Sequence, residues 1–580
     1  MERLERKSVN GHTYYYYSKW GWVDGKCRRL WQKYLGKLED IAAAVERGGA
    51  APLCAEVFQW GLPEALWREC RRAGVLEHVE ALCPKRDQGL TTGAYLALAA
   101  LNRAIAPCSK RSFWEWFAQT TLVRHLPHAS KEALASQRFW DHMDRLDADR
   151  ALAIWKRVLA GVVEREALDL ASVCYDGTNF YTFIDTFNTR CALAQRGKNK
   201  QGRANLRQIS YALFCAAEGS IPLFYDCYEG SRHDAKEFPQ VLQRFHRFLD
   251  EVAQGAGPAP DLTLIFDKGN NSEANFELLD GLKLHFVGSV KLDEHPDLAR
   301  LSNGDPRLTA CVGEDLEGVK AWRVTRSVYG RPRTVVVTYN PDLAHAQWLT
   351  LQHDLAQALE HLTALRQKLE DRARGVVTRG KAPTLDSLRR QCDEARHRQH
   401  LKRLIPVTLT PGPDGVPRLS FAVDTAALHE LSDTWLGKTI LITDREAWDD
   451  ERIIAAYRSQ FLIEEVFKEM KDRATGSWWP LHHWTDSKIR VHALYCTLAL
   501  LMRALMLRRL RRAGLSLSMK RVLAELGAIR EVVNLYPRKR GGQTPPSQSV
   551  LTKTSDLQRQ IMAILGLNQA KDEPENAILG

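Results

Sequence analysis

The sequence lacks the paired cysteines that mark structural zinc sites. Its 12 cysteines are scattered over 580 residues, and no two have the C-x-x-C spacing. Several lie among apolar residues, where a thiol packs as a small hydrophobic group, as at Cys174, Cys215 and Cys496. We therefore expect reduced thiols and a reducing compartment.

A long uninterrupted apolar run is also absent. The N-terminal segment MERLERKSVNGHTYYYY is not a signal sequence. The most apolar stretch, ALYCTLALLMRALML, is broken by Arg503 and flanked by Lys488 and Arg508. It falls short of a membrane span and predicts a buried helix. We expect a cytoplasmic protein that has no membrane partner.

Acidic residues are too few to balance the basic ones. The chain has 82 Lys and Arg against 70 Asp and Glu, which gives a net charge of +12 and a pI of about 9.1. This excess favours a polyanionic partner such as nucleic acid, although many basic proteins bind nothing anionic. Because one core rarely grows beyond a few hundred residues, we expect about two to four structural units.

The N-terminal third has two patterns. Residues 1–40 alternate aromatic and polar groups around Asp24-Gly25, which predicts a β-hairpin. Residues 55–168 have apolar residues at helical spacing, interspersed with basic ones. We assign residues 1–45 to a hairpin region and 46–168 to a helical, DNA-binding domain.

The next segment predicts an α/β core over residues 169–291. Three strand patterns, SVCYDGTNFYTF, QISYALFCAAE and IPLFYDCYEG, are followed by a helix over about 234–253. After the linker QGAGPAP come a strand, a helix and a strand, in LTLIFDKG, SEANFELLDGL and LHFVGSVK.

Residues 292–445 interrupt this pattern. An a/d heptad seam predicts a helical hairpin, and a β-hairpin turning at Pro413-Asp414-Gly415 follows it. The core resumes over 446–515, and 516–580 forms a tail with one short helix. The seam residues are Trp348, Leu351, Leu355, Ala358, Leu362, Leu365 and Leu369.

Three polar residues in YRSQFLIEEVFKEMK repeat at intervals of seven. Tyr457, Glu464 and Lys471 would project from one side of a helix, because seven residues are close to two turns. The same helix can pack through a separate apolar stripe formed by Ile463, Phe467 and Met470.

Two aspartates upstream complete a set of carboxylates. Asp176 in ASVCYDGTNFY and Asp267 in LTLIFDKGN each end an apolar, β-branched run. By itself such an aspartate is more often a turn or capping residue. Together with Glu464, however, they provide the hard oxygen ligands that can hold two Mg²⁺ or Mn²⁺ ions about 3.5–4 Å apart for phosphoryl transfer.

These motifs resemble those of bacterial insertion-sequence transposases of the Asp-Asp-Glu class, in particular the group with a Tyr–Arg–Glu–Lys signature. The resemblance rests on YDGTNF, on FDKG with Asn275 downstream, on Y-x6-E-x6-K, and on the flanking GSIPLFYDCYEGSRHD and LHHWTDSKIRVHALYCTLAL. It implies a ribonuclease-H-like core with an insertion before the glutamate helix. It further implies that Asp176, Asp267 and Glu464 are the catalytic metal ligands.

The resemblance also implies partners and a location. Double-stranded DNA would be bound at the inverted-repeat ends of the element and at the target, by a homodimer in the synaptic complex. The protein would act in the bacterial cytoplasm, associated with the nucleoid. The expected DNA-binding residues are Tyr457, Arg458, Lys468, Lys471, Lys198, Lys200 and Arg203.

The chain departs from the signature at one position. Gln460 stands where the arginine is expected, and glutamine cannot reproduce the bidentate grip of arginine on phosphate. Arg458 or Lys468 would have to compensate, or activity would be reduced. Near the signature, His482-His483 and the neighbouring Trp478, Trp479 and Trp484 could stack on an unpaired base, but we favour closure of a core.

Two alternatives to an active transposase follow from the residues. A catalytically inactive, transposase-derived DNA-binding protein would explain Gln460 but not the intact carboxylates. A covalent recombinase using Tyr457 as nucleophile fits poorly, because a phenol nucleophile needs surrounding arginines and histidines, and only Arg458 is close in sequence.

Overall fold

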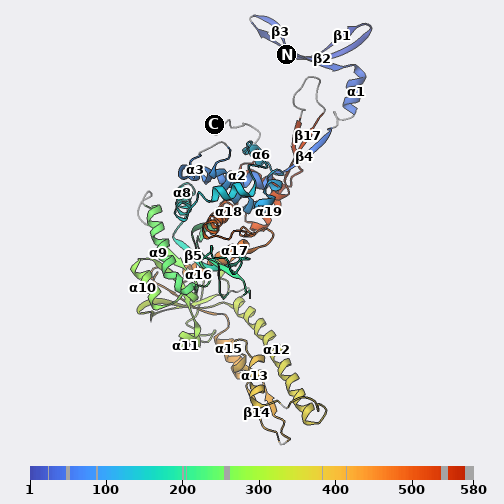
Figure 1. The fold of residues 1–580 in the computed structure, drawn as a ribbon. Helices are drawn as coiled ribbons and strands as arrows, with labels where there is room; N and C mark the ends of the chain where they lie inside the picture. The colour runs from blue at the N-terminus through green and yellow to red at the C-terminus, as the bar shows by residue number, and fades with distance from the viewer. Residues whose placement is uncertain are drawn as a thin grey trace. The chain divides into compact units, whose positions relative to one another are not determined.

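The structure is a computed structural model, and its chain divides into two compact units. The terminal unit consists of Met1–Trp67, Trp114–Ala129 and Arg509–Gly580, and the central unit of Arg68–Phe113 and Ser130–Arg508 (Figure 1). The residues that the structure describes are 1–23, 25–46, 52–85, 89–198, 202–203, 205–253, 261–381, 383–412, 414–536 and 547–567.

A ten-stranded mixed sheet forms the centre of the central unit. Its order is β11-β12-β13-β16-β10-β9-β5-β7-β6, and β8 pairs with β7. The β5–β9 and β9–β10 pairs are parallel, and the others are antiparallel. The strands are β5 Ser172–Tyr181, β6 Gln195–Arg196, β7 Arg207–Ala216, β8 Pro222–Glu229, β9 Thr263–Ile265, β10 His285–Val290, β11 Thr309–Ala310, β12 Lys320–Val328, β13 Arg331–Tyr339 and β16 Lys438–Thr443.

The predicted succession of elements from residue 172 to 290 is confirmed. Helix α9 (Asp234–Ala253) follows β8, and α10 (Glu273–Gly281) connects the parallel strands β9 and β10. Strands β7 and β10 are buried along nearly their whole length, as expected for apolar strands covered on both faces. This mixed α/β architecture is consistent with a ribonuclease-H-like core. The predicted linker at 254–260 lies outside the described residues.

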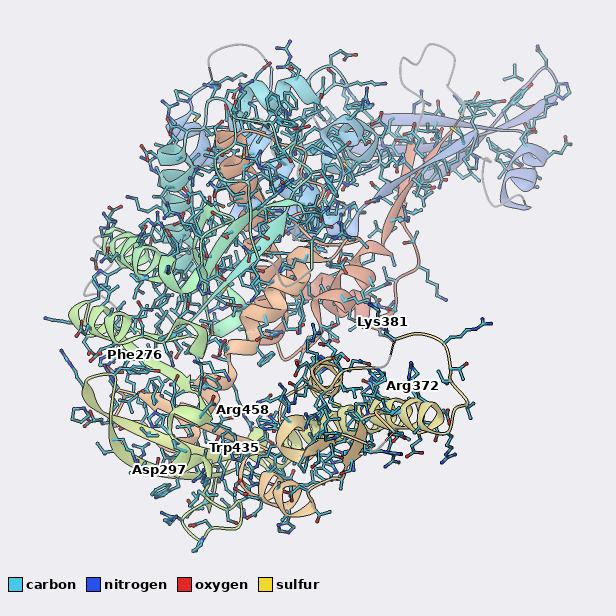
Figure 2. All side chains as sticks on the ribbon, turned by 60° about the horizontal axis from the view of Figure 1, so that its bottom comes forward. Phe276, Asp297, Arg372, Lys381, Trp435 and Arg458 are labelled. Atoms are coloured by element: carbon cyan, nitrogen blue, oxygen red, sulfur yellow. The ribbon has the colours of Figure 1, made fainter. Side chains whose placement is uncertain are left out.

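The segment between β10 and β16 both widens the sheet and adds a separate core. Strand β13 pairs with β16, and β12 with β13, so these strands continue the central sheet. Helices α12 (Pro341–Ala373) and α13 (Leu385–Ala395) pack together with the hairpin β14–β15 (Val407–Thr410 and Arg418–Phe421). Figure 2 shows Arg372 and Lys381 at the loop end of α12.

The predicted heptad seam forms the core of this helical part. Five of its residues are buried, and Trp348 and Leu365 are partly buried against the others. Pro413 of the predicted turn lies outside the described residues, but Gly415 adopts the left-handed conformation that the turn requires, with φ 73°. The buried seam residues are Leu351, Leu355, Ala358, Leu362 and Leu369.

The terminal unit contains two three-stranded antiparallel sheets. Residues 2–36 form three strands, β1-β2-β3, where the sequence predicted only the hairpin around Asp24-Gly25; Asp24 lies outside the described residues. The second sheet, β18-β17-β4, was not predicted. The bounds are β1 Glu2–Val9, β2 His12–Val23, β3 Lys26–Gly36, α1 Leu38–Glu46, β4 Cys54–Gln59, α19 Met519–Gly527, β17 Arg530–Leu535, β18 Ser547–Leu551 and α20 Asp556–Leu565.

Helices dominate residues 61–166, as predicted. Helix α18 (Asp486–Arg512) is, within the described ranges, the one helix long and apolar enough to cross a membrane. Because 94% of its most apolar window is buried inside the protein, it is a core helix, as its sequence indicated. The other helices are α2 Gly61–Arg72, α3 Val75–Leu82, α4 Thr92–Ile105, α5 Phe113–Phe117, α6 Leu122–His125, α7 Ser136–Met143 and α8 Ala148–Glu166.

Candidate active site

The two predicted aspartates lie on neighbouring parallel strands. Cys174 of β5 faces Ile265 of β9 in the register, and Asp176 and Asp267 each follow two residues later. Neighbouring strands lie about 4.8 Å apart, so the two aspartates have the same offset from the last paired residues, with Asp267 two residues beyond the end of β9. Strand β5 itself continues to Tyr181 against β7, so the prediction that Asp176 ends a strand is wrong, and Asp176 lies within β5.

Each aspartate also has a local role. The Asp176 Oδ1 atom accepts a hydrogen bond of 2.7 Å from the Gly177 N–H. The Asp267 side chain caps a short 3-10 turn by accepting a bond of 2.8 Å from the Lys268 N–H. Asp176 is half-buried and Asp267 is exposed, so oxygen atoms of Asp267 face solvent.

The glutamate lies on a helix held along β5. The predicted single helix over Tyr457 to Lys471 is wrong in one respect, because it divides into α16 (Asp450–Arg458) and α17 (Gln460–Lys471). Ser459 lies between them, and its hydroxyl donates to the Ala456 carbonyl oxygen at 2.6 Å. Such bonding of a serine to its own helix bends the chain.

Helix α17 is attached to β5 at both of its ends. Cys174 Sγ lies 3.4 Å from the Ser459 carbonyl oxygen, and Lys471 Nζ donates to Thr178 Oγ1. Cys174, Asp176 and Thr178 share one face of β5, because side chains alternate along a strand. The helix therefore lies on the face of the sheet that carries Asp176. Its apolar stripe is buried, as predicted: Ile463, Phe467 and Met470.

Tyr457 attaches the end of α16 to β10. Its hydroxyl donates a 2.8 Å hydrogen bond to Ser289 Oγ. Ser289 lies on β10, two residues after Val287, and Val287 pairs with Ile265 of β9. Burial raises the pKa of Tyr457, and the negative charges of Asp267 and Glu464 raise it further. Both carboxylates therefore lie within electrostatic range of the same phenol.

These carboxylates have the chemistry of a divalent-cation site. Asp176, Asp267 and Glu464 offer the hard oxygen donors that Mg²⁺ and Mn²⁺ prefer, and two of them are exposed. In the part of the chain that the structure describes, however, no three Asp, Glu, His or Cys side chains form a group that could hold a metal ion. The donor types fit the metal, whereas joint ligation by all three stays a prediction.

Neither basic residue expected to replace the signature arginine is directed at Glu464. Arg458 Nη1 donates to the Asp315 carbonyl oxygen at 2.5 Å. Lys468 is exposed and donates to Glu465 at 2.6 Å, and this hydrogen bond raises the pKa of Lys468. The place of the arginine is thus occupied by Gln460 alone.

Sequence reasoning missed the side chain that holds the end of α17. Arg503, 1% exposed, donates to Glu469 Oε1 at 2.6 Å and to the Thr475 carbonyl oxygen at 2.7 Å. Its Nε and Nη2 atoms donate to the Ala104 carbonyl oxygen at 3.0 and 2.8 Å. The sequence feature that indicates this role is the single arginine within an apolar run, because a buried charge needs hydrogen-bonding partners.

Basic and aromatic residues gather beyond the end of β5. The Arg203 guanidinium lies 4.7 Å above the Tyr181 ring, and Arg473, which was also missed, lies 5.3 Å from that ring and 4.5 Å from Trp479. Lys198 is exposed. Lys200 lies outside the described residues. This surface offers positive charge close to Lys471.

An open pocket of about 470 Å³ adjoins this surface. Trp478, Trp479 and His483 are buried and close a core, as favoured from the sequence. His482 and Trp484 are exposed and do not. The pocket is lined by Phe183, Ile184, Asp185, Asn188, Arg473, Trp479, Pro480, Leu481, His482, His483 and Trp484.

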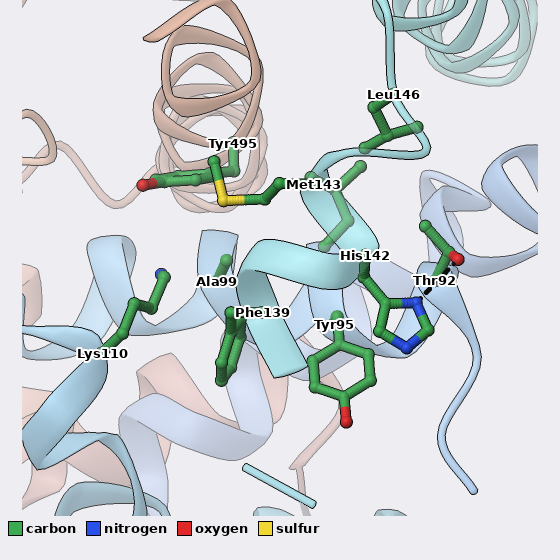
Figure 3. Close-up of a pocket in the computed structure, with 10 residues that line it drawn as sticks. Thr92, Tyr95, Ala99, Lys110, Phe139, His142, Met143, Leu146 and Tyr495 are labelled. Atoms are coloured by element: carbon green, nitrogen blue, oxygen red, sulfur yellow. Dashed lines mark hydrogen bonds between the residues drawn. The ribbon is translucent and has the colours of Figure 1, made fainter. Parts of the chain in front are cut away.

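A second cavity, among α4, α7 and α18, measures about 10 Å³ (Figure 3). It has room for about one water molecule, so it is not a substrate site. Lys110 points into it, and Lys110 Nζ has no hydrogen-bond partner among the described residues. Three aromatic rings surround that atom, at 4.6 Å (Tyr495), 4.8 Å (Phe139) and 5.3 Å (Phe113).

A mixed sheet with one aspartate within a strand and another just beyond the end of the parallel neighbour, faced by a glutamate-bearing helix, is an arrangement suited to phosphoryl transfer. The family described as "Transposase DDE domain" matches residues 173–502, more than half of the chain. The chain belongs to this family. It is therefore a DDE transposase, an enzyme of metal-dependent phosphoryl transfer in DNA transposition.

Other comparisons are weaker. No curated protein matches the chain. A structure titled as the piggyBac transposase synaptic complex with hairpin DNA has 9% identity and a TM-score of 0.36, covering 80% of this chain and 79% of that one. The Mos1 transposase paired-end complex with the left transposon end has 14% identity and a TM-score of 0.15, covering 37% and 63%. TM-scores this low support no further statement about this chain.

Proposed function

We propose that this chain is the transposase of a bacterial insertion sequence, in the group with the Tyr–Arg–Glu–Lys signature. It hydrolyses DNA at the ends of its element and joins the freed 3′-hydroxyls to target DNA. The observation that carries this proposal is the shared register level of Asp176 and Asp267, beneath a helix that bears Glu464.

In this proposal Asp176, Asp267 and Glu464 hold two Mg²⁺ or Mn²⁺ ions. Ions bound there would activate the attacking oxygen and stabilise the leaving oxygen. Glu464 stands on a helix attached to β5 at both ends, and in this proposal its side chain completes the ligand set once DNA is bound. Cleavage and joining are both in-line displacements at phosphorus and can use one site.

The basic residues around the site position the DNA. Lys471 is held at Thr178 on the face of β5 that carries Asp176, close enough to contact a phosphate next to the reacting one. Lys198 and Arg203 contact the backbone further away, and the same role is proposed for Lys200, which lies outside the described residues. Two copies of the chain would hold the two inverted-repeat ends together, since both ends must be joined to one target.

A cleavage assay tests this proposal. The full-length protein is incubated with duplex DNA that contains the sequences flanking its gene, with Mg²⁺, Mn²⁺, Ca²⁺ or EDTA. We expect nicks at the element boundary and joined products with Mg²⁺ or Mn²⁺ only. Cleavage that is equally efficient in EDTA would contradict the proposal.

An inactive, transposase-derived DNA-binding protein is the second candidate. The observation that favours it is that Arg458 and Lys468 bond elsewhere, which leaves Gln460 without a cationic substitute. Under this alternative the protein would bind the same DNA but produce no nick with any metal. Gln460→Arg would then restore cleavage, because the bidentate contact with phosphate would return.

A further inference from the structure

The N-terminal sheet β1-β2-β3 carries a concentration of positive charge that the catalytic proposal does not use. Residues 1–37 contain nine basic residues and three acidic ones, an excess of six within a chain whose net charge is +12. Large side chains are exposed on the sheet, including Trp22 at 78% and Trp31 at 42%. The basic residues are Arg3, Arg6, Lys7, Lys19, Lys26, Arg28, Arg29, Lys33 and Lys37.

The register places five of these cations on one face, at successive levels and distributed over all three strands. Residues 15, 17, 19, 21 and 23 of β2 point to the same face, together with their partners in β1 and β3. Every one of these five levels carries one cation. The levels are Tyr15 with Arg6, Tyr17 with Lys33, Lys19 itself, Gly21 with Arg28, and Val23 with Lys26.

This face, which we call the basic face, is open to solvent. All five of its cations are exposed. Successive levels are about 6.8 Å apart, so the five levels extend over about 27 Å. The described acidic residue on this face, Glu2, pairs with Lys19 at 3.4 Å and accepts a hydrogen bond from Tyr17.

The opposite face of the sheet is different. Arg3 lies 4.5 Å from the Trp20 ring and Lys7 5.0 Å from the Tyr16 ring. Glu5 is the centre of a network there, accepting from Ser18 Oγ at 2.7 Å and Trp20 Nε1 at 2.6 Å. The cations of this face contact aromatic rings or Glu5 of the sheet. Among the cations of the basic face, Lys19 pairs with Glu2 of the sheet.

We propose that the basic face binds the sugar–phosphate backbone of duplex DNA outside the active site. One exposed cation at each successive level of an extended face complements the closely spaced phosphate charges of a duplex. A second copy of the same face would be repelled, since it is itself cationic. This inference rests on the proposed DNA substrate, but it assigns the contact to a part of the chain remote in sequence from the catalytic motifs.

Two triple variants of the full chain test the proposal. Arg6→Gln/Arg28→Gln/Lys33→Gln removes charge from the basic face, and Arg3→Gln/Lys7→Gln/Arg29→Gln removes the same charge from the opposite face. Affinity for a labelled duplex of arbitrary sequence is measured by anisotropy over a range of NaCl concentrations. Circular dichroism checks that both variants keep the fold.

The two triples should differ in their salt dependence. Each lost phosphate contact lowers the magnitude of the slope of log K against log[salt] by about 0.9. The magnitude of the slope should therefore fall by about 2.7 in the basic-face triple variant and by much less in the opposite-face triple variant. Equal losses in both would overturn the proposal, as would a basic-face triple that alters only the oligomeric state. Retained cleavage by Asp176→Asn with an unchanged salt slope would count against the catalytic role of Asp176 but not against this face.

Discussion

Asp176 and Asp267, 91 positions apart in the sequence, each follow by two residues the facing pair Cys174 and Ile265 of two adjacent parallel strands, Asp176 within β5 and Asp267 just beyond the end of β9. Hydrogen bonding of β5 to β9 fixes the register up to Cys174 and Ile265, and Asp267 follows the end of β9 by two residues, where it caps a 3-10 turn. Acidic side chains held in this manner need little reorganisation to receive cations.

The carboxylates should be individually essential for strand cleavage. Asp176→Asn, Asp267→Asn and Glu464→Gln each keep the shape of the side chain but remove the negative charge that attracts a metal ion. We expect each to reduce Mg²⁺-dependent nicking by at least about 10²–10³-fold, because stabilisation of developing charge is lost. Binding to the same DNA should stay within a few fold. The assay is nicking of end-containing DNA on a denaturing gel.

Glu465→Gln is the matched control for that series. Glu465 is the exposed neighbour of Glu464, and it pairs with Lys468. This variant should keep near-normal cleavage. If Glu464→Gln were as active as Glu465→Gln, Glu464 would not belong to the site.

Tyr457→Phe should weaken cleavage without abolishing it. The change removes the hydrogen bond to Ser289 that fixes the phenol near Asp267 and Glu464, while keeping the ring packed. A loss of about 1 kcal/mol is typical of one such bond, or roughly five-fold in rate. A protein–DNA adduct on a denaturing gel, absent in Tyr457→Phe, would instead indicate a covalent recombinase.

Arg503→Met should destabilise the fold markedly. Arg503 is buried, and its donors satisfy Glu469 and the carbonyl oxygens of Ala104 and Thr475. Removing one partner of a buried ion pair costs about 3–5 kcal/mol. Urea unfolding followed by fluorescence would measure the loss in the free energy of unfolding. Arg511→Met, at an exposed position near the end of the same helix, should cost less than about 0.5 kcal/mol. Equal effects of the two would contradict the role given to Arg503.

Lys110→Met should stabilise the protein in a manner that depends on pH. Burial lowers the pKa of Lys110 from 10.5 to about 7 in the folded state. Between these two values the unfolded chain binds more protons than the folded one, so wild-type stability rises with pH across this window. The methionine variant lacks this linkage. It should be more stable at pH 7, by on the order of 2 kcal/mol after the lost cation–π contacts are counted, and this advantage should vanish near pH 10.5.

The difference in Tm between wild type and variant, measured from pH 7 to 10.5, checks this prediction. Lys131→Met is the control, because Lys131 is exposed in the same unit. A constant advantage for Lys110→Met at every pH would show that the gain comes from packing alone.

The strands of the core could be predicted from the sequence because each is an apolar run bounded by turn residues. Strands β7 and β10 bury nearly all of their side chains and β5 most of them, so their local pattern and their tertiary environment agree. The heptad seam of α12 could equally be predicted from the sequence, since Leu355 and Leu362 face the core of the helical part and polar residues face outward.

Other features depend on contacts that no local pattern contains. The break at Ser459 is stabilised by Cys174, which lies 285 residues away in the sequence. Strand β4 pairs with β17, and Val57 is half exposed, so neither alternation nor burial marks β4 as a strand. The shared level of Asp176 and Asp267 likewise became visible only through the strand register, although each aspartate was predicted separately.

Mn²⁺ binding tests the central claim most directly, because it does not depend on knowing the DNA sequence recognised. Bound Mn²⁺ can be counted by electron paramagnetic resonance on the full-length protein with duplex DNA, for wild type and for Asp176→Asn/Asp267→Asn. The account predicts two ions per wild-type chain and their loss in the double variant. Undiminished Mn²⁺ binding by the double variant would contradict it.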